Sequence, residues 1–217
     1  MQRKLIIFDM DGTVVNTGVM ITKTINYVRE HMGLEPIEQK LMLEKLNDPD
    51  LNSSEYFYGT KYFTDKQTEL FEDYYNENCI IGVELYDGMK ELLDKYSQKY
   101  TLTIATNAHT DFAKKILSHL EVDNYFDLII GADMVTNPKP HPEMLEKTMK
   151  KLKFEKNNTV LIGDSLKDQR ASISANIECK LVNWGFSDHK EDEAIEKIED
   201  LSLYLSSLLV RKDLPIS

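Results

Sequence analysis

The fold of this chain is decided by the stretch Lys4-Leu5-Ile6-Ile7-Phe8-Asp9-Met10-Asp11-Gly12-Thr13. Its apolar half is typical of a buried strand, and the carboxylates and glycine that follow indicate that the strand ends in a tight turn. A strand covered on both faces can expose charge only where it stops, and ligands of open parallel sheets bind at that carboxyl end. Asp9 and Asp11 are therefore candidates for chemistry rather than for packing.

Residues 15–84 carry a helical pattern, and we expect no strands among them. Ile21 and Ile25 belong to an apolar series with helical spacing, and Thr64 with Gln67 predicts a capping box at the start of a later helix. The block is therefore expected to be a small helical bundle.

Beyond this block the chain alternates between strands and helices. Such alternation predicts a parallel sheet with right-handed crossovers and helices on both faces. We expect an α/β fold in which residues 1–14 and 85–217 form the core, while residues 15–84 are an inserted helical cap over the carboxyl edge of the sheet. A lid in that place is typical of a gated reaction. The later strands are expected at 101–106, 127–131, 159–164 and 180–184, and a helical tail at 191–210.

The composition excludes some classes of partner. The chain has 26 Lys and Arg against 37 Asp and Glu, a formal net charge of −11, which repels nucleic-acid backbones and anionic membranes. The longest apolar runs fall short of the roughly 20 residues that a membrane span needs, and we find no leader pattern. We therefore expect a cytoplasmic protein with no nucleic-acid partner and no membrane, whose Cys79 and Cys179 are reduced thiols.

Polar side chains follow several of the expected strands, at the points where the strands end. Carboxylates gathered at one sheet edge repel each other unless a cation lies between them, and oxygen ligands without histidine or thiolate favour Mg²⁺. A lysine and a hydroxyl supply the charge and the hydrogen bond that a phosphoryl group needs. The sequence thus predicts a phosphoryl-transfer site with Mg²⁺ as cofactor, built from Asp9, Asp11, Thr106, Asn107, Lys139 and Asp164.

The two carboxylates after the first strand suit different steps of such a reaction. A carboxylate can be the nucleophile and form an aspartyl-phosphate, which divides one difficult hydrolysis into two easier steps. Asp9 is nearer to the strand and is expected to point at phosphorus. Asp11 lies on the same side if the chain stays extended, so that it can protonate the leaving oxygen and later act as a base.

These residues and their neighbours resemble, in order, the four motifs of the haloacid-dehalogenase-like superfamily, and the likeness covers essentially the whole chain. The inserted block resembles that superfamily's first-type helical cap, as found in phosphoglycolate phosphatases and β-phosphoglucomutase. The resemblance implies a Rossmann-like, doubly wound parallel sheet in spatial order 3-2-1-4-5. The motifs are Asp9-Met10-Asp11-Gly12-Thr13, Thr106-Asn107, Lys139-Pro140-His141-Pro142 and Gly163-Asp164-Ser165-Leu166-Lys167-Asp168.

The resemblance also implies roles for single residues. It makes Asp9 the nucleophile and a Mg²⁺ ligand, and Asp11 the acid and base with its backbone carbonyl on the metal. Asp164 completes the metal site, and Asp168 holds a metal-bound water or orients Lys139. By the same likeness, the phosphoryl group is bound by Thr106, Asn107 and Lys139.

The predicted function is therefore Mg²⁺-dependent hydrolysis of the phosphate monoester of a small metabolite. A sugar phosphomutase uses the same catalytic set and stays open. A phosphonate-cleaving relative would need a Schiff-base lysine in the cap, for which Lys23 and Lys45 are candidates. From another class, a phosphoacceptor signalling module fits less well, because such modules lack a large insertion. The substrate is left open, and we expect a monomer or a homodimer.

Overall fold

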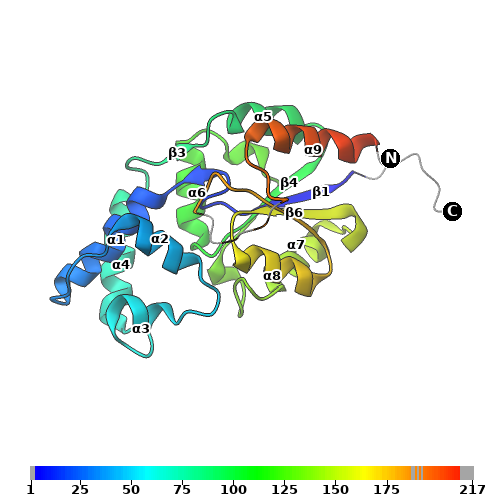
Figure 1. The fold of residues 1–217 in the computed structure, drawn as a ribbon. Helices are drawn as coiled ribbons and strands as arrows, with labels where there is room; N and C mark the ends of the chain where they lie inside the picture. Colours follow the sequence, from blue (N-terminus) through cyan, green and yellow to red (C-terminus); the bar gives the residue numbers. More distant parts are fainter. Residues whose placement is uncertain (1–2, 187–188, 190, 192, 211–217) are drawn as a thin grey trace.

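The core of the protein is a five-stranded parallel sheet (Figure 1). The computed structural model describes residues 3–186, 189, 191 and 193–210. The spatial order of the strands is β5-β4-β1-β6-β7, which in chain order is the predicted 3-2-1-4-5, so this prediction is confirmed. The strands are β1 (Leu5–Phe8), β4 (Thr101–Ala105), β5 (Leu128–Ile130), β6 (Thr159–Gly163) and β7 (Glu178–Leu181).

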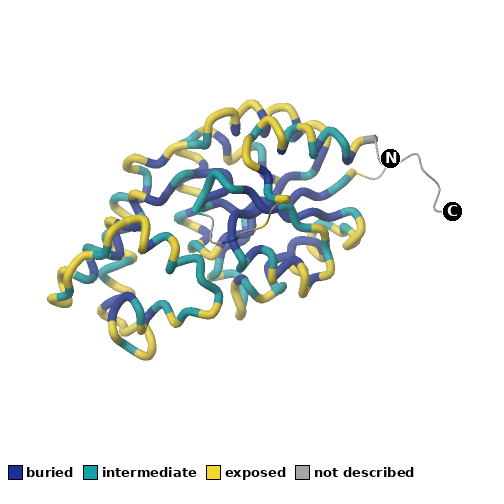
Figure 2. Tube along the Cα trace, in the orientation of Figure 1, coloured by how far each residue is buried: buried dark blue, intermediate teal, exposed yellow. Residues whose placement is uncertain are grey.

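The sheet is covered on both faces, because alternate residues of a strand point to opposite sides. Ile6 and Phe8 pack in one apolar cluster, and Leu5 and Ile7 pack in a second cluster against other helices. Figure 2 shows the strands as the buried centre of the molecule. The first layer consists of α5 (Met89–Ser97), α6 (Thr110–His119) and α9 (Ile198–Val210), and the second of α7 (Glu143–Leu152) and α8 (Leu166–Ala175).

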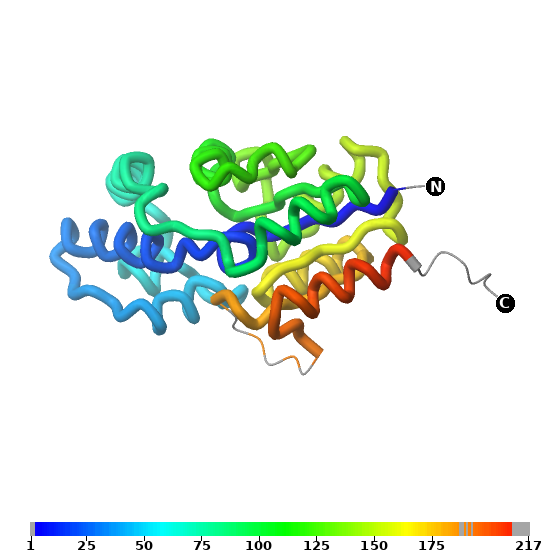
Figure 3. The backbone as a smooth tube through the Cα atoms, turned by 90° about the horizontal axis from the view of Figure 1, so that it is seen from above, coloured from blue at the N-terminus to red at the C-terminus, as the bar shows by residue number. Residues whose placement is uncertain are grey.

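Four further helices lie beyond one end of the sheet, and β1 runs toward them in Figure 3. They have an apolar core of their own, which contains Ile25, Met42 and Phe57. The predicted capping box is confirmed, because Thr64 and Gln67 cap each other at the start of the last of these helices. The helices are α1 (Gly18–His31), α2 (Gln39–Asn47), α3 (Ser53–Tyr58) and α4 (Asp65–Asn78).

The expectation of a block without strands is wrong at its two ends. There β2 (Val15–Asn16) pairs antiparallel with β3 (Glu84–Leu85), so the chain leaves the core and returns to it side by side. Two-residue strands are too short to show a periodicity in the sequence. The division of the chain into a core and a cap stays a prediction.

Some predicted boundaries are also wrong. The last strand ends at Leu181 instead of Trp184, and the final helix begins at Ile198 instead of residue 191. Between them, Ile195 is held at the sheet edge, where its amide donates to the Leu181 carbonyl at 2.8 Å. Short 3₁₀ turns join other elements, namely η1 (Asp123–Tyr125), η2 (Ala132–Met134) and η3 (Lys156–Asn158).

Among the described residues, no helix has the length and apolar character that a membrane span requires.

Candidate active site

The register of the sheet brings the strand ends together. Phe8 of β1 is paired with Ile104 of β4 on one side and with Ile162 of β6 on the other. The residues that follow these partners therefore emerge at one edge. Asp9 and Asp164 are both buried there, after β1 and β6.

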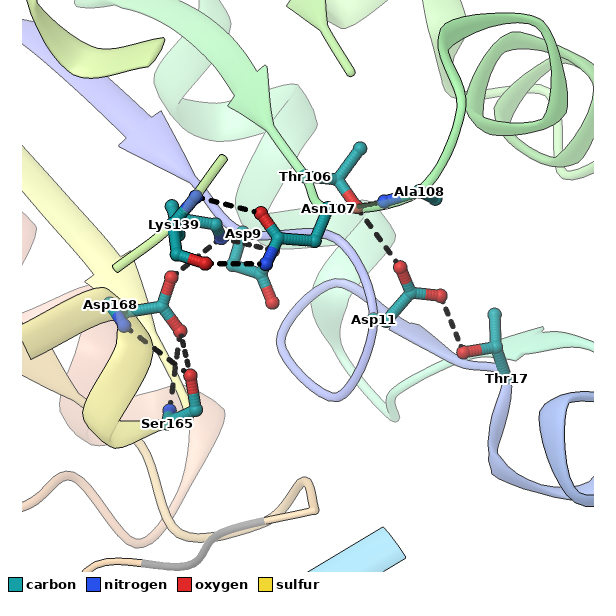
Figure 4. A network of polar contacts seen from close by, with 9 residues as sticks. All are labelled: Asp9, Asp11, Thr17, Thr106, Asn107, Ala108, Lys139, Ser165 and Asp168. Atoms are coloured by element: carbon teal, nitrogen blue, oxygen red, sulfur yellow. Dashed lines mark hydrogen bonds and ion pairs between the residues drawn. The ribbon is translucent and has the colours of Figure 1, made fainter. Parts of the chain in front are cut away.

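Lys139 is the buried cation of this edge. Its Nζ lies 2.6 Å from Oδ1 of Asp9 and 2.6 Å from Oδ1 of Asp168 (Figure 4). Asn107 holds the lysine backbone, since its Nδ2 donates to the Lys139 carbonyl at 2.8 Å and its Oδ1 accepts from the Lys139 amide at 3.0 Å. Burial disfavours the charge of Lys139, but Asp168 and Asp9 outweigh it and raise the pKa of the lysine. The lysine is therefore charged and fixed in position.

Asp168 links this cation to the start of α8. Its Oδ2 accepts hydrogen bonds from the hydroxyl of Ser165 at 2.7 Å and from the Ser165 amide at 3.3 Å. These contacts are part of a capping box, in which Ser165 is the N-cap of the helix. One oxygen of Asp168 thus caps α8 while the other binds Lys139.

Asp11 is held by two threonines. Its Oδ1 accepts from the Thr17 hydroxyl at 2.6 Å, and its Oδ2 accepts from the Thr106 hydroxyl at 3.1 Å. Thr106 Oγ1 in turn accepts from the Ala108 amide at 3.0 Å. Burial raises the pKa of Asp11, and the hydrogen bonds from the two threonines oppose this. An aspartate with a raised pKa is suited to carry a proton for catalysis.

Sequence reasoning missed Thr17, which is the N-cap residue of α1. Its side chain makes no capping hydrogen bond and binds Asp11 instead. A threonine before a helix is normally explained by capping, so the sequence offered no signal for this contact.

Three carboxylates meet beside the lysine. Oxygens of Asp9, Asp164 and Asp168 lie within 4.8 Å of one another. Burial raises the pKa of Asp9 to about 7 although Lys139 opposes it, and burial together with the charge of Asp9 raises the pKa of Asp164 well above its usual value. One lysine does not balance three buried carboxylates. Because oxygen donors of this kind suit hard cations, the cluster fits a divalent ion such as Mg²⁺.

The carboxylate of Asp11 lies outside this cluster and binds the threonines. Its predicted metal contact is through the backbone carbonyl, which stays a prediction.

Asp164 is fixed by the loop after β7. Its Oδ2 accepts from the Phe186 amide at 2.8 Å. A side chain on either of the two glycines beside it would force the surrounding atoms to move, because a Cβ on Gly12 would lie 2.2 Å from Asp164 Oδ2 and one on Gly185 would lie 1.9 Å from the Gly12 carbonyl. Sequence reasoning missed Phe186, since any residue except proline could supply the amide.

A cavity of about 420 Å³ opens onto Asp9, Asp11, Thr106 and Lys139. This volume is in the range of small-molecule sites. Among the described residues, its wall on the side of α1, α2 and α4 contains Ile21, Ile25, Leu46, Asn47, Phe71, Glu72 and Tyr75. Lys23 and Lys45 are not part of the described lining, so the structure gives no support to a Schiff-base lysine at either position.

Comparison with known proteins identifies the family. The model of the haloacid dehalogenase-like hydrolases matches residues 6–182. The chain is 28% identical over 204 residues to a phosphoglycolate phosphatase of Colwellia psychrerythraea, covering 86% of this chain and 87% of that protein. It is 28% identical over 188 residues to the pyrophosphatase PpaX of Halalkalibacterium halodurans, covering 85% of each.

A solved structure agrees with this result. The crystal structure of a predicted phosphoglycolate phosphatase from Haemophilus somnus superposes with a TM-score of 0.81 at 25% identity, covering 95% of this chain and 99% of that one. The predicted family, the Rossmann-like fold and the assignment as an enzyme are confirmed. The chain belongs to the haloacid dehalogenase-like hydrolases.

Proposed function

We propose that this protein is a Mg²⁺-dependent phosphatase that hydrolyses the phosphate monoester of a small metabolite through an aspartyl-phosphate on Asp9. The proposal is carried by one observation, the convergence of Asp9, Asp164 and Asp168 on one another, with Lys139 bound to Asp9 and Asp168 and a cavity that opens onto Asp9 and Lys139. The relatives named phosphatases support it. A cytoplasmic location and a monomeric or homodimeric state stay predictions.

In the first half of the reaction, Asp9 attacks phosphorus. A bond forms between its carboxylate oxygen and phosphorus while the ester P–O bond breaks. Asp11 gives its proton to the leaving oxygen, so that a neutral alcohol departs. Lys139 orients Asp9 through Oδ1 and balances charge on the phosphoryl group.

In the second half, water attacks the phosphorus of the aspartyl-phosphate. Asp11 takes a proton from this water, and the bond between phosphorus and Asp9 breaks, which releases orthophosphate and restores the carboxylate. The two threonines keep Asp11 in place through both halves.

Asp9 and Asp164, with the backbone carbonyl of Asp11, would hold Mg²⁺, which supplies charge neutralisation for the phosphoryl oxygens when it is bound.

The test is orthophosphate release from a panel of phosphate monoesters. We expect the wild type to release phosphate with Mg²⁺ and to lose activity in EDTA. Asp9→Asn should abolish turnover because an amide is a poor nucleophile, and circular dichroism should confirm that this variant is folded. Equal release by Asp9→Asn and the wild type would contradict the proposal.

A further inference from the structure

The inserted helices supply a mainly apolar wall to the cavity. From α1 it receives Ile21 and Ile25, and from α4 it receives Phe71, Glu72 and Tyr75. Residues three or four apart share one face of a helix, so that Glu72 and Tyr75 are neighbours on α4. Tyr75 is only 3% exposed whereas Glu72 is exposed, so Tyr75 is the buried part of this wall and Glu72 the part open to solvent.

Tyr75 lies on the catalytic side of this wall. Asp11 and Tyr75 line the same cavity, and burial together with the charge of Asp11 raises the pKa of the Tyr75 phenol. The hydroxyl of Tyr75 makes no hydrogen bond with any residue in the described part of the chain. A ligand that extends from the phosphoryl site along this wall therefore meets Tyr75 and Glu72 as lining residues of the same cavity.

The other charged side chains among the described residues that line the cavity already form hydrogen bonds or ion pairs within the protein. Lys139 binds Asp9 and Asp168, as set out above. Lys167 donates to the Leu46 carbonyl at 2.6 Å. Asp133 accepts from the amide and the hydroxyl of Thr110, and its Oδ2 lies 3.9 Å from Nε2 of His109.

Glu72 differs from these groups. Within the ranges that the structure describes, its carboxylate has no hydrogen bond and no ion pair, although it lines the cavity. A carboxylate that lacks such a partner and lies beside apolar side chains attracts a cation or a hydrogen-bond donor and repels a second anion.

We propose that the alcohol part of the substrate carries a hydrogen-bond donor, an ammonium or a hydroxyl group, which binds Glu72, and that it carries no second anionic group. The carbon skeleton would lie along Phe71 and Tyr75. This inference rests on the proposed phosphatase function and names the substrate class of that site. It separates this chain from a phosphoglycolate phosphatase, because the carboxylate of phosphoglycolate would face Glu72.

Three two-carbon monoesters test the inference. The probes are 2-aminoethyl phosphate, 2-hydroxyethyl phosphate and phosphoglycolate, which end in a positive, a neutral and a negative group on skeletons of the same length. We expect kcat/KM of the wild type with Mg²⁺ to be highest for the aminoethyl or hydroxyethyl ester and lowest for phosphoglycolate.

Variants of Glu72 then isolate its contribution. In Glu72→Gln, the preference for the aminoethyl ester over phosphoglycolate should fall by about fivefold, the limit for a solvent-exposed ion pair. In Glu72→Lys the preference should reverse. Asp73→Asn is the matched control, because Asp73 is an exposed residue of α4 outside the described cavity lining, and it should leave the preference unchanged.

Two results overturn the inference while the phosphatase proposal stands. The first is that phosphoglycolate is the best of the three substrates and that the preference between the esters is the same in Glu72→Gln as in the wild type. A loss of that activity in Lys167→Met would then assign anion binding to Lys167. The other is turnover of p-nitrophenyl phosphate with none of the three esters cleaved. Failure with p-nitrophenyl phosphate and with the whole monoester panel would instead contradict the phosphatase function itself.

Discussion

Nζ of Lys139 lies 2.6 Å from Oδ1 of Asp9, and both side chains are buried. Oδ1 of Asp168 also lies 2.6 Å from this Nζ. Lys139, Asp9 and Asp168 stabilise one another in the folded protein, because a buried charge without a partner costs several kcal/mol. The site is therefore also a part of the protein's stability.

Lys139→Met should destabilise the protein by about 3 kcal/mol when divalent metal is chelated, because it leaves buried carboxylates unpaired. The free energy of unfolding is measured by urea titration in EDTA. The double variant Lys139→Met with Asp168→Asn should be more stable than Lys139→Met alone, since one unpaired charge is removed. A single variant as stable as the wild type would show that the lysine does not compensate these charges.

Thr17→Val should lower kcat on the order of tenfold, because Asp11 loses one of the two hydrogen bonds that orient it for proton transfer. Thr17→Ser keeps the hydroxyl and should retain most of the activity. Steady-state kinetics with saturating Mg²⁺ measures both variants, and KM should change less than kcat. Equal kcat values for the valine and serine variants would exclude the hydroxyl as a positioning group.

Asp133→Ala should cost about 1 kcal/mol of stability at pH 7, because the Asp133 carboxylate accepts two hydrogen bonds at the start of α6. Burial opposes ionisation of Asp133, but the hydrogen bonds from Thr110 outweigh it and lower its pKa. A lowered pKa means that this contribution is complete above the unfolded value of about 4 and is lost as the pH falls further. Urea titrations at pH 7 and pH 3 measure the difference, which should shrink at pH 3. The same difference at both values would contradict the prediction.

Asp50→Asn should weaken the contact between the inserted helices and the core. Asp50 follows α2, and its oxygens lie 2.7 Å from the Nη1 and Nη2 atoms of Arg170 on α8. Salt screens such an exposed pair and thereby weakens this contact. We therefore expect KM of the wild type to rise with ionic strength, by less than about fivefold. The rise of KM with ionic strength should be smaller in Asp50→Asn than in the wild type. Glu44→Gln is the control, because it removes a charge from α2 that is not paired with Arg170, and its KM should respond to salt as that of the wild type does. A steep dependence in Asp50→Asn would assign the salt effect to other charges.

The sequence predicted the sheet well, because each strand is an apolar run between helices with clear periodicity. The strand order follows from the family resemblance, and the polar residues at strand ends do meet at one edge. Thr64 and Gln67 were readable as a cap because that pattern depends on two side chains at a fixed spacing.

Other features depend on contacts that leave no pattern in the sequence. The pairing of Val15–Asn16 with Glu84–Leu85 joins segments that are far apart in the chain and too short to show alternation. The hydrogen bond from the Phe186 amide to Asp164 uses a backbone group that every residue except proline has. The role of Thr17 depends on where its hydroxyl points, which its position before a helix does not reveal.

The close approach of Gly12 and Gly185 limits how this enzyme can vary. A methyl group on Gly185 would overlap the carbonyl of Gly12, and one on Gly12 would overlap Asp164. Neither glycine has a functional group, yet even alanine at either position would push the turn after β1 away from the loop after β7. Natural selection should therefore preserve these two residues as strictly as the carboxylates that they help to hold.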